Sequence, residues 1–395
     1  MEIYIRGKEL PDSIIKDVLQ VTYKDSINEI DSFTIEINNW DATTRTFKFV
    51  PPLKANGQDF TGIFDPGTAI EISMGYGKKN LRRMMKGQIT SLAPKFNESG
   101  APSLTVGGLN ELHQFRTEQH TRSWQDGQFT DTKIATELCK APLKKGQAGL
   151  GIDIETNPAP DEAAETFVFM NNQYDVVFLL ERARRHGYEI YIKNGIGSKK
   201  PRLYFGLSEN RALAPVYQLE WGKSLINFRP TLTTAKQVST VTVRGWDRKS
   251  NSAIEASYTL EELWKKQNKS AREIQRQRQI AKAFGNRTEV VTDKPVHTKQ
   301  EAKDLARSIL EKQNKNLVEG TGSTVGLPDL RAGCALQIVG FGLKSDGTGK
   351  LVGASSDFDG NYYVTETTHT IGGDGYRTEF SARREGEIGN STASA

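Results

Sequence analysis

The sequence predicts a mainly β, α+β fold with two similar β-barrel domains, an α+β domain between them and a helical insertion in the second barrel. Three observations lead to this prediction. Short segments alternate apolar and polar residues, one turn-and-strand pattern occurs twice, and amphipathic helical segments interrupt the strands. The 395 residues exceed what one compact core usually holds, so we expect several domains.

Residues 1–112 are predicted to form the first β-barrel domain. The segments Val21–Tyr23, Phe33–Ile37 and Ala69–Met74 alternate apolar with polar residues, which is the period of a half-buried strand. Polar turns separate them, and several short strands at this spacing are typical of a barrel or sandwich.

Residues 113–222 are predicted to form an α+β domain. The segment Gln173–His186 carries apolar residues at helical spacing, and Gly187 stands where a left-handed C-terminal cap belongs. Tyr188, Ile190 and Ile192 then alternate as a strand.

The second barrel is predicted from residues 223–257 and 319–386, and residues 258–318 form a helical insertion within it. The last helix of the insertion opens with Thr298 and Glu301 at the spacing of a capping box. Residues 387–395 are small and polar, and we expect a flexible tail.

An internal repeat supports two copies of one barrel. Gly67 precedes Ile70 and Ile72 by three and five residues, and Gly333 precedes an apolar pair, Leu336 and Ile338, at the same offsets. Upstream, we expect the hairpins 21–37 and 238–256 to correspond. A chance likeness of two turns is the alternative interpretation. Under duplication, three chains could present six similar positions around one axis.

Composition excludes several protein classes. Hydrophobic residues make up 36% and charged residues 26%, as in folded proteins rather than disordered ones. No apolar run approaches the roughly 20 residues of a membrane span, and the N-terminus shows no secretory signal. We therefore expect no membrane insertion and assembly in the cytoplasm. A net charge of +5 is weak evidence for nucleic-acid binding unless the charge is clustered.

The sequence nominates no catalytic, cofactor or metal site. Cys139 and Cys334 stand far apart and lack the spacing of zinc ligands, so each is expected to be a lone thiol. His113 and His120 are the closest histidine pair, and no further ligands accompany them. His369 is interpreted as a packing residue that hydrogen-bonds within the barrel. No GxSxG elbow is present, so we expect no enzyme.

One basic segment is a candidate docking site for a partner. It runs from 264 to 287, and its candidate residues are Lys265, Lys266, Lys269, Arg272 and Arg276. Three interpretations stay open: a solvated face of an amphipathic helix, an acidic surface of a partner protein, or DNA passing through a lumen.

The C-terminal third contains three recognisable motifs between His297 and Arg384. They are Gly326-Leu327-Pro328-Asp329-Leu330-Arg331-Ala332-Gly333, the strand from Tyr362 to His369, and Gly375-Tyr376-Arg377-Thr378-Glu379-Phe380. In these motifs the chain resembles the phage late control D family, which comprises the hub proteins of contractile tails and is related to the N-terminal part of type VI secretion spike proteins.

This resemblance implies a structural baseplate hub in a virion or an extracellular injection particle. The hub would be a homotrimer with pseudo-sixfold symmetry that joins a hexameric tail tube to a trimeric spike. Because only a short tail follows Arg384, the spike is expected to be a separate chain. Baseplate wedge or other hub-associated proteins are further expected partners. The alternatives are a tail-associated peptidoglycan hydrolase and a DNA- or glycan-binding tail module.

Overall fold

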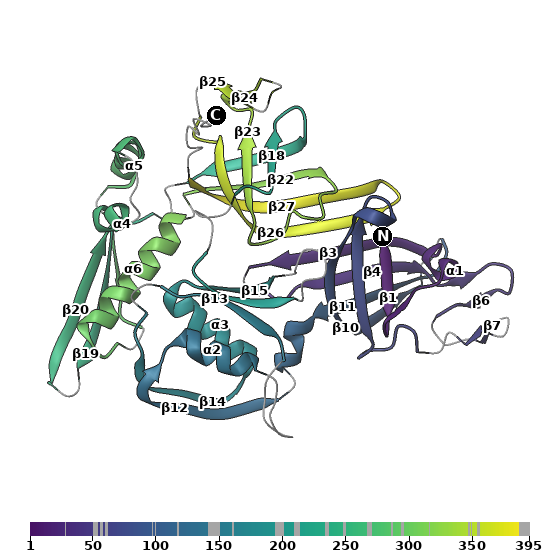
Figure 1. Ribbon diagram of the computed structural model, residues 1–395, viewed down its shortest axis with the longest axis horizontal. Helices are drawn as coiled ribbons and strands as arrows, with labels where there is room; N and C mark the ends of the chain where they lie inside the picture. The colour runs from purple at the N-terminus through teal and green to yellow at the C-terminus, as the bar shows by residue number, and fades with distance from the viewer. Residues whose placement is uncertain are drawn as a thin grey trace.

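The structure is a computed structural model of the whole chain (Figure 1). It describes residues 1–386 apart from gaps at 28, 50–53, 56–57, 60–61, 97, 99, 117, 141–150, 160–161, 194–200, 209–213, 234–236, 248–249, 267–270, 286, 294–295, 316, 347, 349 and 354–355. The predicted tail 387–395 lies outside the described residues. The fold is mainly β with several sheets, as predicted.

The first six-stranded unit, here called unit 1, has the strand order β3-β4-β11-β10-β9-β1. Its strands are β1 (Glu2–Ile5), β3 (Val18–Ser26), β4 (Ser32–Asn38), β9 (Ala69–Gly75), β10 (Leu81–Lys95) and β11 (Ser103–Asn110), and β2 (Lys8–Glu9) pairs with β1 at the edge. Alternate side chains such as Phe33, Ile35 and Ile37 are buried in one core because successive strand residues face opposite sides.

The second unit, unit 2, has the order β18-β22-β27-β26-β23-β17. Its strands are β17 (Tyr217–Glu220), β18 (Leu225–Leu232), β22 (Val318–Val325), β23 (Ala335–Val339), β26 (Gly360–Gly372) and β27 (Gly375–Gly386). Taken in chain order, each strand occupies the same place as its counterpart in unit 1. One pairing differs: β1 runs antiparallel to β9, whereas β17 runs parallel to β23. The predicted duplication is therefore confirmed at the level of strand order.

Two β-bulges fall at matching places in the two units. The β10–β11 ladder skips Thr90 and the β26–β27 ladder skips Thr365. The β3–β4 ladder skips Leu19 and the β18–β22 ladder skips Ile226. Because bulges bend and twist a strand at a defined position, shared bulges give the two sheets a shared shape.

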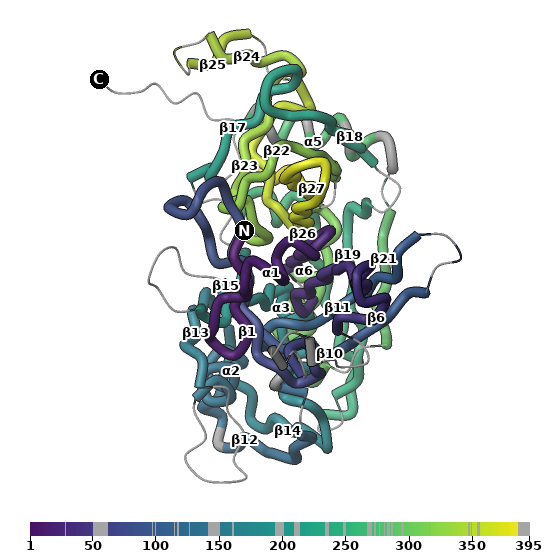
Figure 2. The backbone as a smooth tube through the Cα atoms, turned by 90° about the vertical axis from the view of Figure 1, so that its right-hand side faces the viewer, coloured from purple at the N-terminus to yellow at the C-terminus, as the bar shows by residue number. Residues whose placement is uncertain are grey.

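The two units form one continuous sheet because β3 pairs antiparallel with β26. Among the described residues this sheet has 13 strands. Figures 1 and 2 show the N-terminal β3 beside the C-terminal β26 in both views, although the two strands lie at opposite ends of the sequence.

The α+β domain packs around its own apolar core, which contains Ile134, Leu179 and Phe205. Its elements are η2 (Glu111–Arg116), β12 (Gln119–Phe129), α2 (Asp131–Cys139), β13 (Asp153–Asn157), β14 (Glu165–Tyr174), α3 (Asp175–His186), β15 (Glu189–Lys193) and β16 (Arg202–Gly206). Gly187 caps α3 in the left-handed conformation, with φ of 68°, as its position in the sequence predicts.

The insertion in unit 2 is larger than predicted. It contains β19 (Thr240–Asp247), β20 (Ser252–Thr259), α4 (Leu260–Lys266), α5 (Ala271–Phe284), β21 (Thr288–Val291) and α6 (Lys299–Lys315). Strands β19, β20 and β21 form their own sheet, and α6 packs against β19 and β20 (Figure 1).

The predicted correspondence of hairpins 21–37 and 238–256 is therefore wrong. The counterpart of β3–β4 is β18–β22, and residues 233–257, which the sequence pattern assigns to the second barrel, belong with the insertion. The physical reason is burial: Val241, Val243 and Tyr258 pack on α6 in a core separate from that of unit 2. The other domain boundaries stay a proposal.

The remaining elements are short. They are α1 (Asp12–Ile15), β5 (Trp40–Asp41), β6 (Thr46–Phe47), β7 (Lys54–Ala55), β8 (Gln58–Asp59), η1 (Lys78–Asn80), β24 (Leu343–Ser345) and β25 (Leu351–Gly353). Within the described residues, no helix combines the length and the apolar character needed to cross a membrane.

Candidate assembly site at the seam between the two units

The seam is the line where β3 of unit 1 meets β26 of unit 2. Its register runs from Ser26 opposite Glu366 to Val21 opposite Ile371. Side chains of alternate pairs point to the buried side, so Asp25 lies with Thr367 and Tyr23 lies with His369 in the interior.

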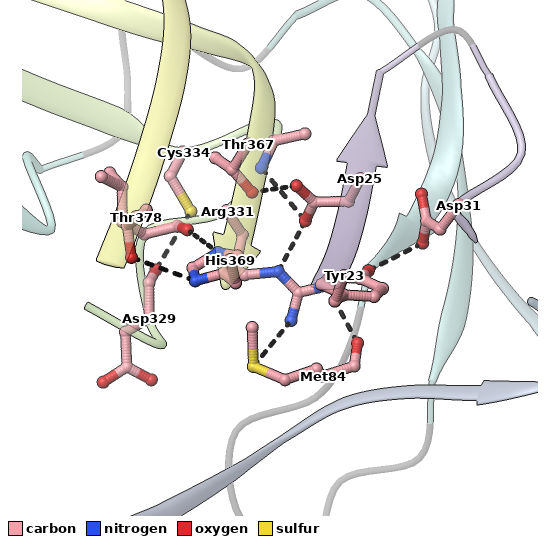
Figure 3. Close-up of polar contacts among 12 residues, drawn as sticks. Tyr23, Asp25, Asp31, Met84, Asp329, Arg331, Cys334, Thr367, His369 and Thr378 are labelled. Atoms are coloured by element: carbon pink, nitrogen blue, oxygen red, sulfur yellow. Dashed lines mark hydrogen bonds and ion pairs between the residues drawn. The ribbon is translucent and has the colours of Figure 1, made fainter. Parts of the chain in front are cut away.

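Arg331 connects the two units across this seam (Figure 3). It lies on the loop before β23, and its Nε donates to Asp25 Oδ2 at 2.6 Å. Its Nη2 donates to the Tyr23 hydroxyl and to the Met84 carbonyl, the latter at 2.9 Å. The guanidinium also lies 4.7 Å from the centre of the Tyr23 ring. One side chain of unit 2 thus contacts three residues of unit 1.

Burial makes these contacts strong and their loss costly. Asp25 and Asp31 are buried, and Tyr23 donates to Asp31 Oδ2 at 3.1 Å. Burial raises the pKa of Asp31 to about 7, and the neighbouring Asp25 charge adds to this rise while Arg331 opposes it. The pKa of Tyr23 is also raised by burial, so the phenol stays neutral and can donate.

His369 hydrogen-bonds on both ring nitrogens inside the seam. Its Nε2–H donates to the Leu330 carbonyl at 3.0 Å. Its Nδ1 therefore accepts, and the hydroxyls of Tyr376 and Thr378 lie 3.0 and 3.1 Å away. Burial lowers the pKa of this imidazole to about 4, which keeps it neutral. The prediction of a packing histidine is confirmed.

The α+β domain contacts the seam from one side through hydrogen bonds and an ion pair. Ile27, directly after β3, donates its N–H to the Thr365 carbonyl at 3.1 Å and accepts from Ile190 N–H at 3.2 Å. Glu189 on β15 accepts from Tyr363 and, at 2.7 Å, from Arg383. Three parts of the chain therefore converge on one line.

The opposite face of the continuous sheet is polar. Exposed and half-buried side chains on it include Lys24, Thr34, Thr105, Arg229, Thr321, Glu366, Thr368 and Glu379. Lys24 Nζ lies 3.3 Å from Glu366 Oε1 across the seam, so charges on this face are partly paired. In unit 2 the face is hollowed into a cavity of about 310 Å³ lined by Arg229, Glu366 and Glu379 among others.

The basic segment does not lie at the seam. Lys265 and Lys266 are exposed at the end of α4. Lys269 lies outside the described residues, and Arg272 and Arg276 lie in α5 with side chains outside the described set. Arg278 on α5 pairs with Glu261 at 2.8 Å, so part of the positive charge is neutralised within the insertion. Docking of a partner here stays a prediction.

Chemically reactive groups are held in unreactive settings. Burial raises the pKa of the Cys139 thiol to about 12 and raises that of Cys334 as well. In the part of the chain that the structure describes, no group of three or more His, Cys, Asp or Glu side chains could hold a metal ion. His120 instead lies 3.2 Å from Asp175 Oδ1.

The sequence singled out none of the residues that cross the seam as a site. Arg331 is part of a recognisable motif, but its partner Asp25 lies 306 positions away, so no local pattern connects them. One feature of the sequence could have indicated this site. Asp25 lies on the same strand face as the apolar Val21 and Tyr23, and a carboxylate buried on such a face requires a partner.

Comparisons with known proteins agree with this architecture. A family model described as "Alg8 N-terminal domain" matches residues 1–373. Among solved structures, the chain resembles the 43 kDa tail protein of prophage MuSo2 from Shewanella oneidensis, with 14% identity, 97% of each chain covered and a TM-score of 0.64. It also resembles the tail protein from Neisseria meningitidis MC58, with 14% identity, 97% of this chain and 96% of that chain covered, and a TM-score of 0.60.

A third resemblance is to the E. coli c3393 protein, described as a component of the type VI secretion system. Identity is 13%, the match covers 98% of this chain and 78% of that one, and the TM-score is 0.57. No curated protein matches the sequence. At these identities the structural matches show a shared fold. The matching family model carries another name than late control D, so it does not show membership of that family.

Proposed function

We propose that this chain, which belongs to the Alg8 N-terminal domain family, is a non-enzymatic structural component of a phage tail or related injection machine. More specifically, we propose a late control D-type baseplate hub that works as a homotrimer. It would join a hexameric tail tube to a separate trimeric spike and would contact other baseplate proteins. Its location would be a virion or an extracellular injection particle. The shared fold with tail proteins and a type VI secretion component supports this.

One observation carries the proposal: two units with the same strand order and matching bulges lie in one continuous sheet. Three chains would then place six similar units around a threefold axis. Such a ring offers six near-equivalent positions to a sixfold tube and three identical positions to a spike. We place the polar face on the inside of this ring, because the opposite face of each unit is occupied by its core.

The test is the mass of the pure protein in solution. Light scattering after gel filtration is expected to give three times the 43.9 kDa of one chain. A monomer that stays monomeric when mixed with tube and spike proteins would contradict the hub. A zymogram on peptidoglycan tests the non-enzymatic part, and clearing by the pure protein would contradict it.

A further inference from the structure

Each unit has one long strand whose two halves pair differently. In unit 2, one edge of β26 pairs with β23 over residues 360–363 and with β3 over residues 366–371. In unit 1, the corresponding edge of β10 pairs with β9 over residues 81–88. Within the described residues, no strand pairs with that edge over residues 91–95, nor with the edge of β18 that faces away from β22. Among the described strands, unit 1 thus has an open edge at residues 91–95 of β10, and unit 2 has one along β18.

The bulges fix how the two units correspond, residue by residue. Thr90 and Thr365 are skipped at matching places, so positions 91–95 of β10 correspond to 366–370 of β26. Leu19 and Ile226 are skipped likewise, so positions 21–25 of β3 correspond to 228–232 of β18. The register of the existing seam can therefore be transferred to the two open edges.

On the core-facing side of the sheet, the transferred register places apolar residues opposite apolar residues. The pair Thr367–Asp25 becomes Leu92 opposite Leu232. The pair His369–Tyr23 becomes Pro94 opposite Pro230, and Thr368–Lys24 becomes Ala93 opposite Thr231. The counterpart of Arg331 is the exposed Asp65, so the open edges have no cation in that place. The core-facing pairs have therefore changed from polar to apolar on both strands, whereas the pair Thr370–Thr22 on the other face becomes Lys95 opposite Arg229.

We infer that β18 of one copy pairs with residues 91–95 of β10 in the next copy, and that the Leu92–Leu232 contact selects this pairing. The inference rests on the proposed function and names the surface through which the copies meet. Leu92 is half-buried against the core of unit 1 and Leu232 against that of unit 2, so the new seam would join those cores. Phe96 and Ile226, which are 63% and 49% exposed, flank the open edges and would gain cover.

The two seams are chemically incompatible with each other, which excludes wrong pairings. If β3 paired with β10 of another copy, Asp25 would face Leu92 and become a buried carboxylate without a partner. If β18 paired with β26, Arg331 would lose Asp25 and face Leu232. Proline on an open edge also disfavours unspecific strand pairing, because it cannot donate an N–H to a neighbouring strand. With Pro94 opposite Pro230, the two missing donors fall at the same position along the seam, and the other residue pairs keep theirs.

The test is a disulfide across the inferred seam. Ala93→Cys with Thr231→Cys places one thiol on each open edge at the inferred register, and oxidation is expected to link three chains covalently. Lys24→Cys with Thr368→Cys is the matched control, because that pair faces across the existing seam and must link within one chain. Ala93→Cys with Arg229→Cys is out of register by two residues and is expected to stay unlinked.

A second measurement tests the apolar contact. Leu232→Asp is expected to weaken association of the copies roughly tenfold or more, because the carboxylate would face Leu92 without a partner. Adding Leu92→Arg to Leu232→Asp recreates an ion pair at this place and is expected to restore association. Circular dichroism checks that each variant is folded.

The outcomes separate the two proposals. If the protein is a trimer but the variant carrying Ala93→Cys and Thr231→Cys forms no covalent link, the inferred seam is wrong and the proposed hub is unaffected. The same holds if the charge-pair variant does not restore association. Efficient linking in register into rings or chains of another number would support the seam and contradict the trimeric hub. A monomer without linking would overturn both.

Discussion

Units 1 and 2 have the same strand order and bulge positions but pack different side chains in their cores. In unit 1, Phe33 on β4 lies opposite Gly108 on β11, and a Cβ on that glycine would come within 2.3 Å of the Phe33 ring. In unit 2 the corresponding position on β22 is Gly320, which lies against Phe228 on β18. The phenylalanine that fills this part of the core therefore stands on β4 in unit 1 and on the neighbouring strand, β18, in unit 2. Strand order and bulges, rather than residue identity, define the repeat.

The largest expected effect comes from breaking the link between the units. Arg331→Met removes the cation but leaves Asp25 buried, so we expect a loss of about 3–5 kcal/mol in the free energy of unfolding. Urea unfolding at one fixed protein concentration measures it. Arg244→Met is the matched control: its pair with Glu255 is exposed, and we expect at most about 1 kcal/mol. Equal losses for both variants would contradict the conclusion that the buried ion pair between Arg331 and Asp25 holds the two units together.

A second experiment compares the two cores. Gly322→Ala brings a Cβ to 2.6 Å from the Phe380 ring, and overpacking is expected to cost about 1–3 kcal/mol. At the matching place in unit 1 stands the buried Ile35, where Ile35→Ala removes volume and is expected to cost about 2–5 kcal/mol. Gly373→Ala, which meets no atom within 4 Å, is the control and should be nearly neutral. A stabilising Gly322→Ala would show that the cores are not packed as described.

The pH dependence of the seam tests two buried groups with opposite signs. Burial lowers the pKa of His369 from 6.5 to about 4, so its contribution to stability is lost as pH falls through this range. Burial raises the pKa of Asp31 from 3.8 to about 7, so its contribution is lost as pH rises through that range. Between about pH 4 and 6.5 the two slopes oppose each other, and the intact protein should show a shallow net dependence.

Single variants are expected to reveal each slope. Asp31→Asn should lose stability as pH falls, by up to about 1.4 kcal/mol per pH unit for one proton, and His369→Gln should lose stability as pH rises. Unfolding free energies measured in urea at several pH values between about 4.5 and 6.5 give the slopes. Identical slopes in the two variants would refute the assignment.

The smallest expected effect concerns the polar face of the same seam. Lys24 pairs with Glu366 at 3.3 Å, and both side chains are about two-fifths exposed. Lys24→Met should therefore change the unfolding free energy by at most about 1 kcal/mol, and the effect should shrink in high salt. A loss as large as that of Arg331→Met would mean that the polar face, rather than the buried side, connects the units.

Much of the fold could be predicted from local patterns, and the exceptions have physical causes. Alternation located Phe33–Ile37 as a strand, and the glycine offsets aligned β9 with β23. The hairpin of unit 2 was misplaced because β18 contains Asn227, Arg229 and Pro230, which weaken the alternation typical of a strand. Its partner β22 follows only after the whole insertion, whereas β19 and β20 form an obvious local hairpin.

The candidate site could be predicted least, because it depends on contacts between distant segments. His369 was correctly interpreted as a packing residue, since aromatic and β-branched neighbours on its strand indicate burial. Asp25, Tyr23 and Arg331 gave no joint signal, because no local pattern in the sequence indicates that β3 lies beside β26. Only the folded sheet brings these three side chains together.

The insertion of unit 2 leaves and rejoins the sheet at a single point. Thr233 N–H donates to the Leu317 carbonyl at 3.0 Å, so the two ends of the inserted segment are held side by side. The pairing of β18 with β22 therefore does not depend on the length of the segment inserted between them. Another domain could therefore stand between these two residues without changing the strand order of unit 2, as long as it kept the packing of α6 against α3.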